Sequence, residues 1–101
     1  SLLPAGADLV ALVKPQFEAG RGQVDRRGVV RNPDVHVEVL RKVAARGVNV
    51  GMPPQEVTYS PLRGPAGNIE FLMRFVRDGA ARRATLDATI TDVVTEAHAT
   101  I

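Results

Sequence analysis

The sequence predicts an α/β fold, and three observations support that prediction. A short, nearly continuous apolar run, "DLVALVK", is followed after a loop by a segment with helix-capping residues at both ends. Two more apolar segments, separated by a turn-rich stretch, come next, and the chain closes with apolar residues at helical spacing. The expected order is strand, loop, helix, strand, strand, helix, an α/β pattern with a terminal hairpin. It contains too few strands for a complete doubly wound sheet.

Composition narrows the class of protein. The 101 residues, 45% of them hydrophobic and 24% charged, suit a single folded domain with a modest core. No apolar run approaches the roughly 18 to 20 residues of a membrane span, so we expect a cytoplasmic protein without a membrane segment. Cysteine is absent, and the two histidines, His36 and His98, lie far apart in the sequence. We therefore expect neither disulfides nor a metal site.

The first strand is predicted over residues 8–14. A continuous apolar run of this length fits a strand buried on both faces, as in a parallel sheet. Its last residue, Lys14, would lie at the carboxyl edge of the sheet, where α/β proteins bind ligands. Desolvation there favours the neutral amine, which is the form that accepts a proton. Lysines at strand ends are also common surface residues with the ammonium in solvent, and this alternative stays open.

The loop over residues 18–34, "EAGRGQVDRRGVVRNPD", combines three glycines with several arginines and has no helical period. Loops of this length in a compact domain usually have a function. Arg21, Arg26 and Arg27, together with Arg63 in a later turn-rich stretch, are suited to bidentate phosphate contacts. The alternative for each arginine is an ordinary solvated surface position.

A helix is predicted from Asn32 to Gly47. Asn32 is a capping residue, Pro33 suits the first helical position, and Gly47 is expected to end the helix in a left-handed conformation. His36 is expected at the surface, on a face away from the apolar stripe. That stripe is formed by Val35, Val39, Leu40 and Val43.

A strand around Val57 and Tyr59, the turn-rich stretch 60–68 and a strand over 69–76 predict an antiparallel hairpin. Glu70 marks the entry into the last strand. In such a hairpin this end lies at the carboxyl edge of the first strand, so Glu70 would share a crevice with Lys14. A carboxylate there would hold the ammonium and tune its basicity. The alternative is a solvated residue at a strand start.

The closing segment, residues 80–101, is predicted to be an amphipathic helix that packs on the same domain, with Thr85 as a possible cap. Its apolar positions are Leu86, Ile90, Val93, Val94 and Ala97. The first strand has the composition of a central strand and needs neighbours that these residues do not provide. We therefore expect either the C-terminal part of a longer protein or a sheet completed by a second chain.

Three segments, "ADLVALVKPQFEAGRG", "GVVRNPDVH" and "SPLRGPAGNIEFL", resemble the hemolysin A (TlyA-type) proteins, which are ribosomal RNA 2'-O-methyltransferases with an FtsJ-like catalytic domain. The resemblance covers about residues 2–78. It implies that residues 1–79 are the C-terminal half of a Rossmann-like, S-adenosylmethionine-dependent methyltransferase domain. It also implies ribosomal RNA as the partner.

The resemblance further implies a Lys-Asp-Lys-Glu tetrad that acts on ribose 2'-hydroxyls. The second lysine of the tetrad matches Lys14 and the glutamate matches Glu70. The other two members, and the glycine-rich cofactor loop, belong to segments upstream of Ser1. In this interpretation Arg21, Arg26, Arg27 and Arg63 contact RNA phosphates.

A second hypothesis is a non-catalytic, truncated homologue that binds RNA or forms oligomers by pairing an exposed sheet edge. The family name hemolysin also suggests pore formation, for which the sequence has no membrane-spanning pattern.

Overall fold

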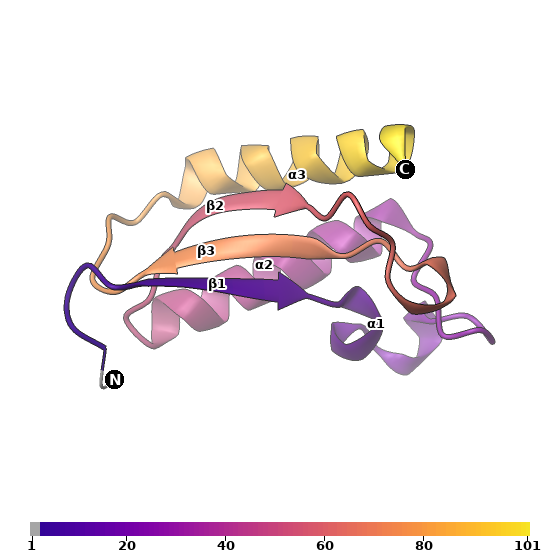
Figure 1. Cartoon of the computed structure of the whole chain (residues 1–101), viewed down its shortest axis with the longest axis horizontal. Coiled ribbons are helices and arrows are strands. Elements are labelled where there is room, and N and C mark those ends of the chain that lie inside the picture. The colour runs from indigo at the N-terminus through magenta and orange to yellow at the C-terminus, as the bar shows by residue number, and fades with distance from the viewer. Residues whose placement is uncertain (1–2) are drawn as a thin grey trace.

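The computed structural model describes residues 3–101, with the backbone alone at residues 83 and 84. Residues 1 and 2, which the predicted domain includes, lie outside the described part. The described residues form a three-stranded antiparallel sheet in the order β1 (Asp8–Val13), β3 (Phe71–Val76), β2 (Pro54–Tyr59). Helices α2 (Pro33–Asn49) and α3 (Arg83–Thr100) cover one side of it (Figure 1). The predicted α/β pattern with a β2–β3 hairpin and a C-terminal helix is confirmed.

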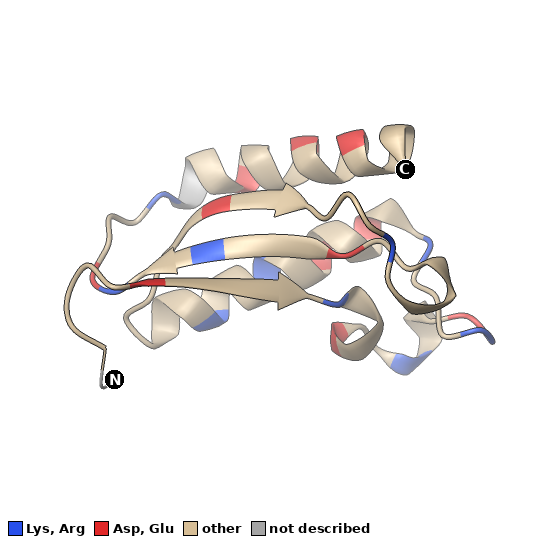
Figure 2. Ribbon diagram, in the orientation of Figure 1, with Lys and Arg blue, Asp and Glu red and all other residues tan. Residues whose placement is uncertain are grey.

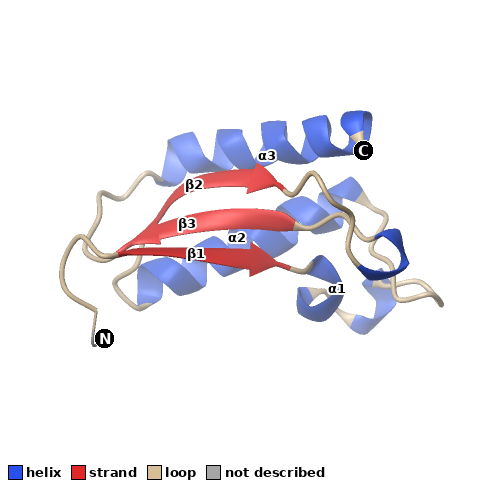
Figure 3. Cartoon of the chain, in the orientation of Figure 1, coloured by secondary structure: helices blue, strands red, loops and turns tan. Residues whose placement is uncertain are grey.

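Short helical turns lie at the end of the sheet where β1 and β2 finish and β3 begins (Figure 3). They are α1 (Pro15–Glu18) and the 3₁₀ turns η1 (Arg21–Gln23) and η2 (Pro65–Gly67). The predicted loop after the first strand is otherwise irregular. The turns that carry the predicted site residues therefore lie at one end of the molecule.

The core follows from the alternation of side chains along β3. Phe71, Met73 and Phe75 point to the helices and are buried, while the residues between them are half-buried on the opposite face. Val13 lies opposite Phe71, and Val57 lies opposite Met73. Because cross-strand partners share a face, these residues form one apolar layer under α2 and α3.

Strand β1 differs from the prediction of a strand buried on both faces. Among the described residues it pairs only with β3, and it does so in the antiparallel direction. Leu9, Val10 and Leu12 are 48%, 60% and 47% exposed. The apolar run therefore contains more hydrophobic side chains than the described residues cover, and the free edge of β1 presents unpaired backbone groups.

Helix α2 begins as predicted and ends differently. The Asn32 side chain accepts a hydrogen bond from the Asp34 backbone N–H (2.9 Å), and Pro33 is the first helical residue. The prediction that Gly47 ends the helix is wrong: the helix continues to Asn49, and Gly51 is the residue with positive φ (75°). Gly47 is instead required for packing, because a Cβ there would lie 2.6 Å from the Phe75 ring.

His36 is fully buried, which contradicts its predicted surface position. Its Nδ1 lies 2.7 Å from His98 Nε2, and its ring packs edge-on against Phe71 at 5.4 Å between centroids. Burial, followed by the nearby His98, lowers the pKa of His36 to about 4, although the Val30 carbonyl opposes this change. Helix α3 therefore supplies a polar partner for His36 Nδ1, while His36 Nε2 is buried without a hydrogen-bond partner among the described residues.

Helix α3 packs on β2 and α2 through Leu86, Ile90, Val94 and Ala97, all buried. The prediction that Thr85 caps it is wrong, because the helix begins at Arg83 and Thr85 lies inside its first turn. Its carbonyl accepts a bond from the Thr89 hydroxyl (3.0 Å). Within the described chain, no helix has the length and apolar character needed to cross a bilayer.

Candidate functional site

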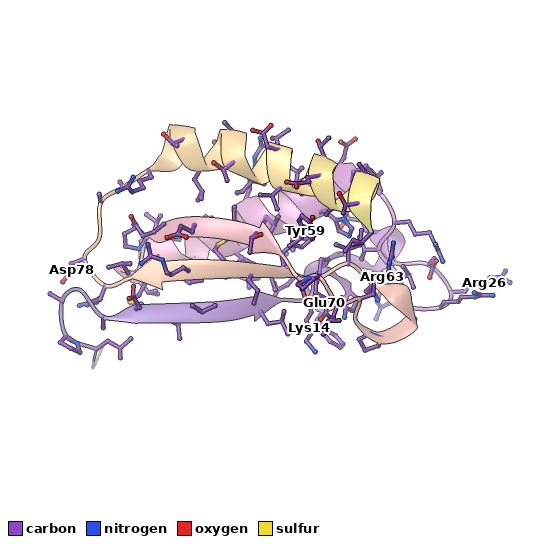
Figure 4. All side chains as sticks on the ribbon, turned by 45° about the horizontal axis from the view of Figure 1, so that its top comes forward. Lys14, Arg26, Tyr59, Arg63, Glu70 and Asp78 are labelled. Carbon is purple, nitrogen blue, oxygen red and sulfur yellow. The ribbon has the colours of Figure 1, made fainter. Side chains whose placement is uncertain are left out.

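The structure places Lys14 and Glu70 at the same end of the sheet (Figure 4). Val13, the last residue of β1, is paired with Phe71, the first residue of β3, so the residues just beyond each lie side by side. Lys14 is half-buried and Glu70 is only 6% exposed. In the described residues no hydrogen bond or ion pair joins the two side chains directly. The ammonium and the carboxylate therefore lie at the same end of the sheet without a direct contact.

Glu70 is held tightly from two sides. Its Oε2 accepts a hydrogen bond from Gln16 Nε2 (3.0 Å), and its backbone carbonyl accepts one from the Ser60 N–H (2.8 Å). Gly64 lies directly against the carboxylate, because a Cβ at that position would be 2.2 Å from Oε2. Only a residue without a side chain lets the β2–β3 connection close over Glu70.

The turn after β1 fixes the backbone at Lys14. Pro15 is buried at the first position of α1, and the Phe17 N–H donates to the Lys14 carbonyl (3.0 Å). The carboxylate of Glu18 forms an ion pair with Arg46 on α2 (2.7 Å), which connects this turn to the larger helix. A hollow of about 280 Å³ lies beside Lys14. It is lined by Ala11, Leu12, Val13, Lys14, Phe17, Glu18, Val43 and Arg46.

The arginine loop, residues 19–32, is organised by Asp25. The carboxylate of Asp25 accepts from the backbone N–H groups of Arg27 and Val29 (2.9 Å each) and from Arg31 Nε (2.7 Å). The Val29 N–H and the Arg31 side chain lower the pKa of Asp25 below its ordinary value. This tight turn leaves Arg26 and Arg27 exposed at its tip. Figure 4 shows Arg26 projecting away from the body of the molecule.

Asn68 connects the arginine loop to the turn that carries Glu70. Its buried side chain accepts from the Val30 N–H (3.0 Å) and donates to the carbonyls of Gly28 (2.9 Å) and Pro65 (3.1 Å). The amide thus satisfies backbone groups of both segments. The predicted phosphate-binding loop and the turn that carries the predicted catalytic carboxylate are therefore connected through one buried side chain.

The four arginines predicted to bind RNA fall into two groups. Among the described residues, the side chains of Arg21, Arg26 and Arg27 make no hydrogen bond or ion pair and are exposed. Arg63 is exposed but already bonded, because it donates to the carbonyls of Gly67 (2.6 Å) and Ile101. Figure 2 shows basic residues recurring through the loops at this end.

Sequence reasoning missed Gln16, Gly64 and Asn68 as parts of the site. Gln16 lies in "KPQF", where a proline directly after a strand signals a helical turn that directs the second side chain back towards the sheet. Asn68 lies in a glycine-rich turn, where asparagine commonly bonds nearby backbone groups. Glycine at 64 had no distinguishing signal among other turn formers. In the described chain, no group of three or more metal-binding side chains is present.

These features define a class of protein. The model of the family described as "FtsJ-like methyltransferase" matches residues 2–77, and the chain belongs to that family. The non-catalytic alternative is not favoured by this membership.

Two of the similar proteins carry names that refer to rRNA methylation. The chain is 41% identical over 103 residues to "Putative rRNA methyltransferase YqxC" of Bacillus subtilis, covering 100% of this chain and 37% of that protein. It is 46% identical over 67 residues to "16S/23S rRNA (cytidine-2'-O)-methyltransferase TlyA" of Mycobacterium tuberculosis, covering 66% of this chain and 25% of that protein. The chain thus spans about a quarter to a third of the length of these relatives.

A solved structure, "Putative hemolysin from Streptococcus thermophilus", superposes with a TM-score of 0.86 at 39% sequence identity. The superposition covers 96% of this chain and 34% of the other.

Proposed function

We propose that the protein containing this chain is an S-adenosylmethionine-dependent methyltransferase that methylates ribose 2'-hydroxyls of ribosomal RNA in the cytoplasm. The observation that supports this most strongly is the position of Lys14 and Glu70, each directly beyond the paired residues Val13 and Phe71, in a chain of the FtsJ-like methyltransferase family. In this proposal Lys14 and Glu70 are catalytic residues. Relatives named as rRNA methyltransferases supply the substrate class.

A ribose hydroxyl is a weak nucleophile, so its attack benefits from a group that orients or removes its proton. Lys14 would serve this purpose from the end of β1. Glu70 would hold the Lys14 ammonium in place. Bound S-adenosylmethionine supplies an electrophilic methyl group. The hollow beside Lys14, about 280 Å³, is smaller than usual ligand pockets, and the glycine-rich cofactor loop that the family implies is absent from the described residues. In this proposal the rest of the same protein supplies the cofactor loop.

The free edge of β1 is consistent with a sheet that further strands complete. We propose that a strand from the rest of the same protein pairs with it and completes a Rossmann-like sheet. Such a strand would satisfy the unpaired backbone groups of β1, and the helices on the second face of a completed Rossmann-like sheet would cover the exposed Val10 and Leu12. A second copy of the chain on this edge would instead make the protein a dimer. Light scattering on the intact protein separates the two, since the first predicts no dimer through β1.

RNA binding is assigned to the arginine loop. Arg26 and Arg27 are exposed on a turn braced by Asp25, and Arg21 is exposed in the preceding η1 turn of the same loop. Arginine contacts to phosphates are independent of sequence and weaken with salt, so this surface would position RNA without selecting the nucleotide. Arg63 is included in the proposed surface through its exposed guanidinium, although it also braces the Gly67 turn.

The function is tested by incubating the intact protein with ribosomal RNA and S-adenosylmethionine carrying a labelled methyl group. Ribose 2'-O-methylation blocks alkaline cleavage of the adjoining phosphodiester, so the label is expected in alkali-resistant dinucleotides. Label confined to the bases, or no label at all, would overturn the proposal.

A further inference from the structure

The side chain of Gln16 carries an unused acceptor next to Glu70. Its Nε2 donates to Glu70 Oε2 (3.0 Å) across a separation of 54 residues. Its Oε1 is buried and has no hydrogen-bond partner among the described residues. A carboxylate can only accept, so the amide nitrogen must face Glu70 and the oxygen must face away from it. The orientation of this amide is therefore fixed by chemistry.

We propose that Gln16 is a positioning residue with two tasks: Nε2 orients the Glu70 carboxylate, and Oε1 accepts from the Lys14 ammonium that Glu70 would bind in the proposed site. This inference rests on the proposed methyltransferase function. An ammonium has three donors, so it can bond to Glu70 and to Gln16 Oε1 together. A buried amide oxygen without a partner is unfavourable, and a hydrogen bond from the Lys14 ammonium to Gln16 Oε1 would remove that penalty.

The neutral amide suits this task better than a cation would. A cationic donor at residue 16 would neutralise Glu70 and compete with the ammonium for it. Gln16 orients the carboxylate and leaves its full charge available. Its own position is set by the α1 turn, where buried Pro15 and the Phe17-to-Lys14 backbone bond hold the chain next to the end of β1.

The kinetic test uses the intact protein and two variants. Gln16→Ala is expected to lower kcat about tenfold, with KM for RNA within about twofold, since one hydrogen bond to a charged group is lost. Gln16→Glu places a second carboxylate against Glu70. Two neighbouring carboxylates resist joint ionisation, so the rise of rate with pH should move to higher pH. Gln55→Glu is the matched control, because Gln55 bonds Arg82 and the Ala80 carbonyl rather than the site residues.

A second measurement does not depend on activity. NMR of the ¹⁵N-labelled intact protein should show the Gln16 side-chain amide signals moving as acid protonates Glu70, and this response should vanish in Glu70→Gln. The Gln55 amide is an internal reference. Either an unchanged pH profile in Gln16→Glu or Gln16 amide signals that ignore Glu70 would overturn the inference. A wild-type protein that does not methylate RNA would instead refute the proposed function. The amide signals would then still test whether Gln16 bonds to Glu70.

Discussion

Replacing Gly64 by alanine should displace Glu70 without straining the backbone. Gly64 has φ −80° and ψ −167°, an extended conformation that alanine adopts freely. The added Cβ would lie 2.2 Å from Glu70 Oε2 and 2.4 Å from its Cδ. An ordinary contact needs about 3.4 Å, so the carboxylate must move by roughly 1.2 Å, since 3.4 − 2.2 = 1.2.

The magnitude follows from what this movement breaks. A shift of this size removes the Gln16 bond to the carboxylate, which costs about 1.5–3 kcal/mol for a charged acceptor. Replacing glycine at a compatible site returns about 0.4–1 kcal/mol through the unfolded state. The expected net loss in free energy of unfolding is about 1–2 kcal/mol. A catalytic group displaced by about 1 Å also lowers the methylation rate by about 100-fold.

Two assays on the intact protein test this reasoning, namely urea denaturation and methyl transfer to ribosomal RNA. The control is a double-mutant cycle with Glu70→Ala, in which the steric conflict is gone. In that background Gly64→Ala should cost nothing, or stabilise by about 0.4–1 kcal/mol. If Gly64→Ala costs the same in both backgrounds, the clash with Glu70 is not its cause and the account of this turn is wrong.

Three further predictions follow from the core and the loop. Gly47→Ala should destabilise by about 1–3 kcal/mol despite its better helix propensity, because its Cβ would lie 2.6 Å from the Phe75 ring; urea denaturation measures this. The pKa of His36 is lowered from 6.5 to about 4, so burying the neutral ring contributes its full stability to the folded protein above pH 6.5. This contribution of roughly 3 kcal/mol to the free energy of unfolding is lost as pH falls towards 4. His36→Gln should therefore show a weaker acid loss in denaturation at pH 7 and 4.5, and equal losses would contradict the pKa. Arg26→Ala and Arg27→Ala should each weaken RNA binding and lower the slope of log affinity against log salt by about 1 in filter-binding titrations, whereas an unchanged slope removes that arginine from the interface.

The parts of the fold that were predictable are those with a local cause. Asn32 and Pro33 mark the start of α2 through capping, which needs no tertiary information. The hairpin followed from the short turn-rich connection, and its direction brings Glu70 to the end of β1 beyond Val13. The main geometry of the candidate site was therefore accessible from strand order and polarity alone.

The parts that were not predictable depend on contacts between distant elements. His36 lies four residues before buried Leu40, so helical spacing alone was compatible with burial, but its contact with His98 on α3 joins residues 62 positions apart. Gly47 has the composition of a helix end and instead admits the Phe75 ring. The support that Gln16 gives Glu70 spans 54 residues, and no local pattern reports it.

The most direct test of the central claim is single-turnover methylation of ribosomal RNA by the intact protein and its Lys14→Ala and Glu70→Ala variants. General acid–base groups contribute about 10²–10⁴-fold, so each variant should lose at least about 100-fold in rate. RNA affinity should stay within about twofold, because the arginine loop supplies the phosphate contacts. A Lys14→Ala protein that methylates at the wild-type rate, with the label still on ribose, would contradict the assignment of this strand end as the catalytic site.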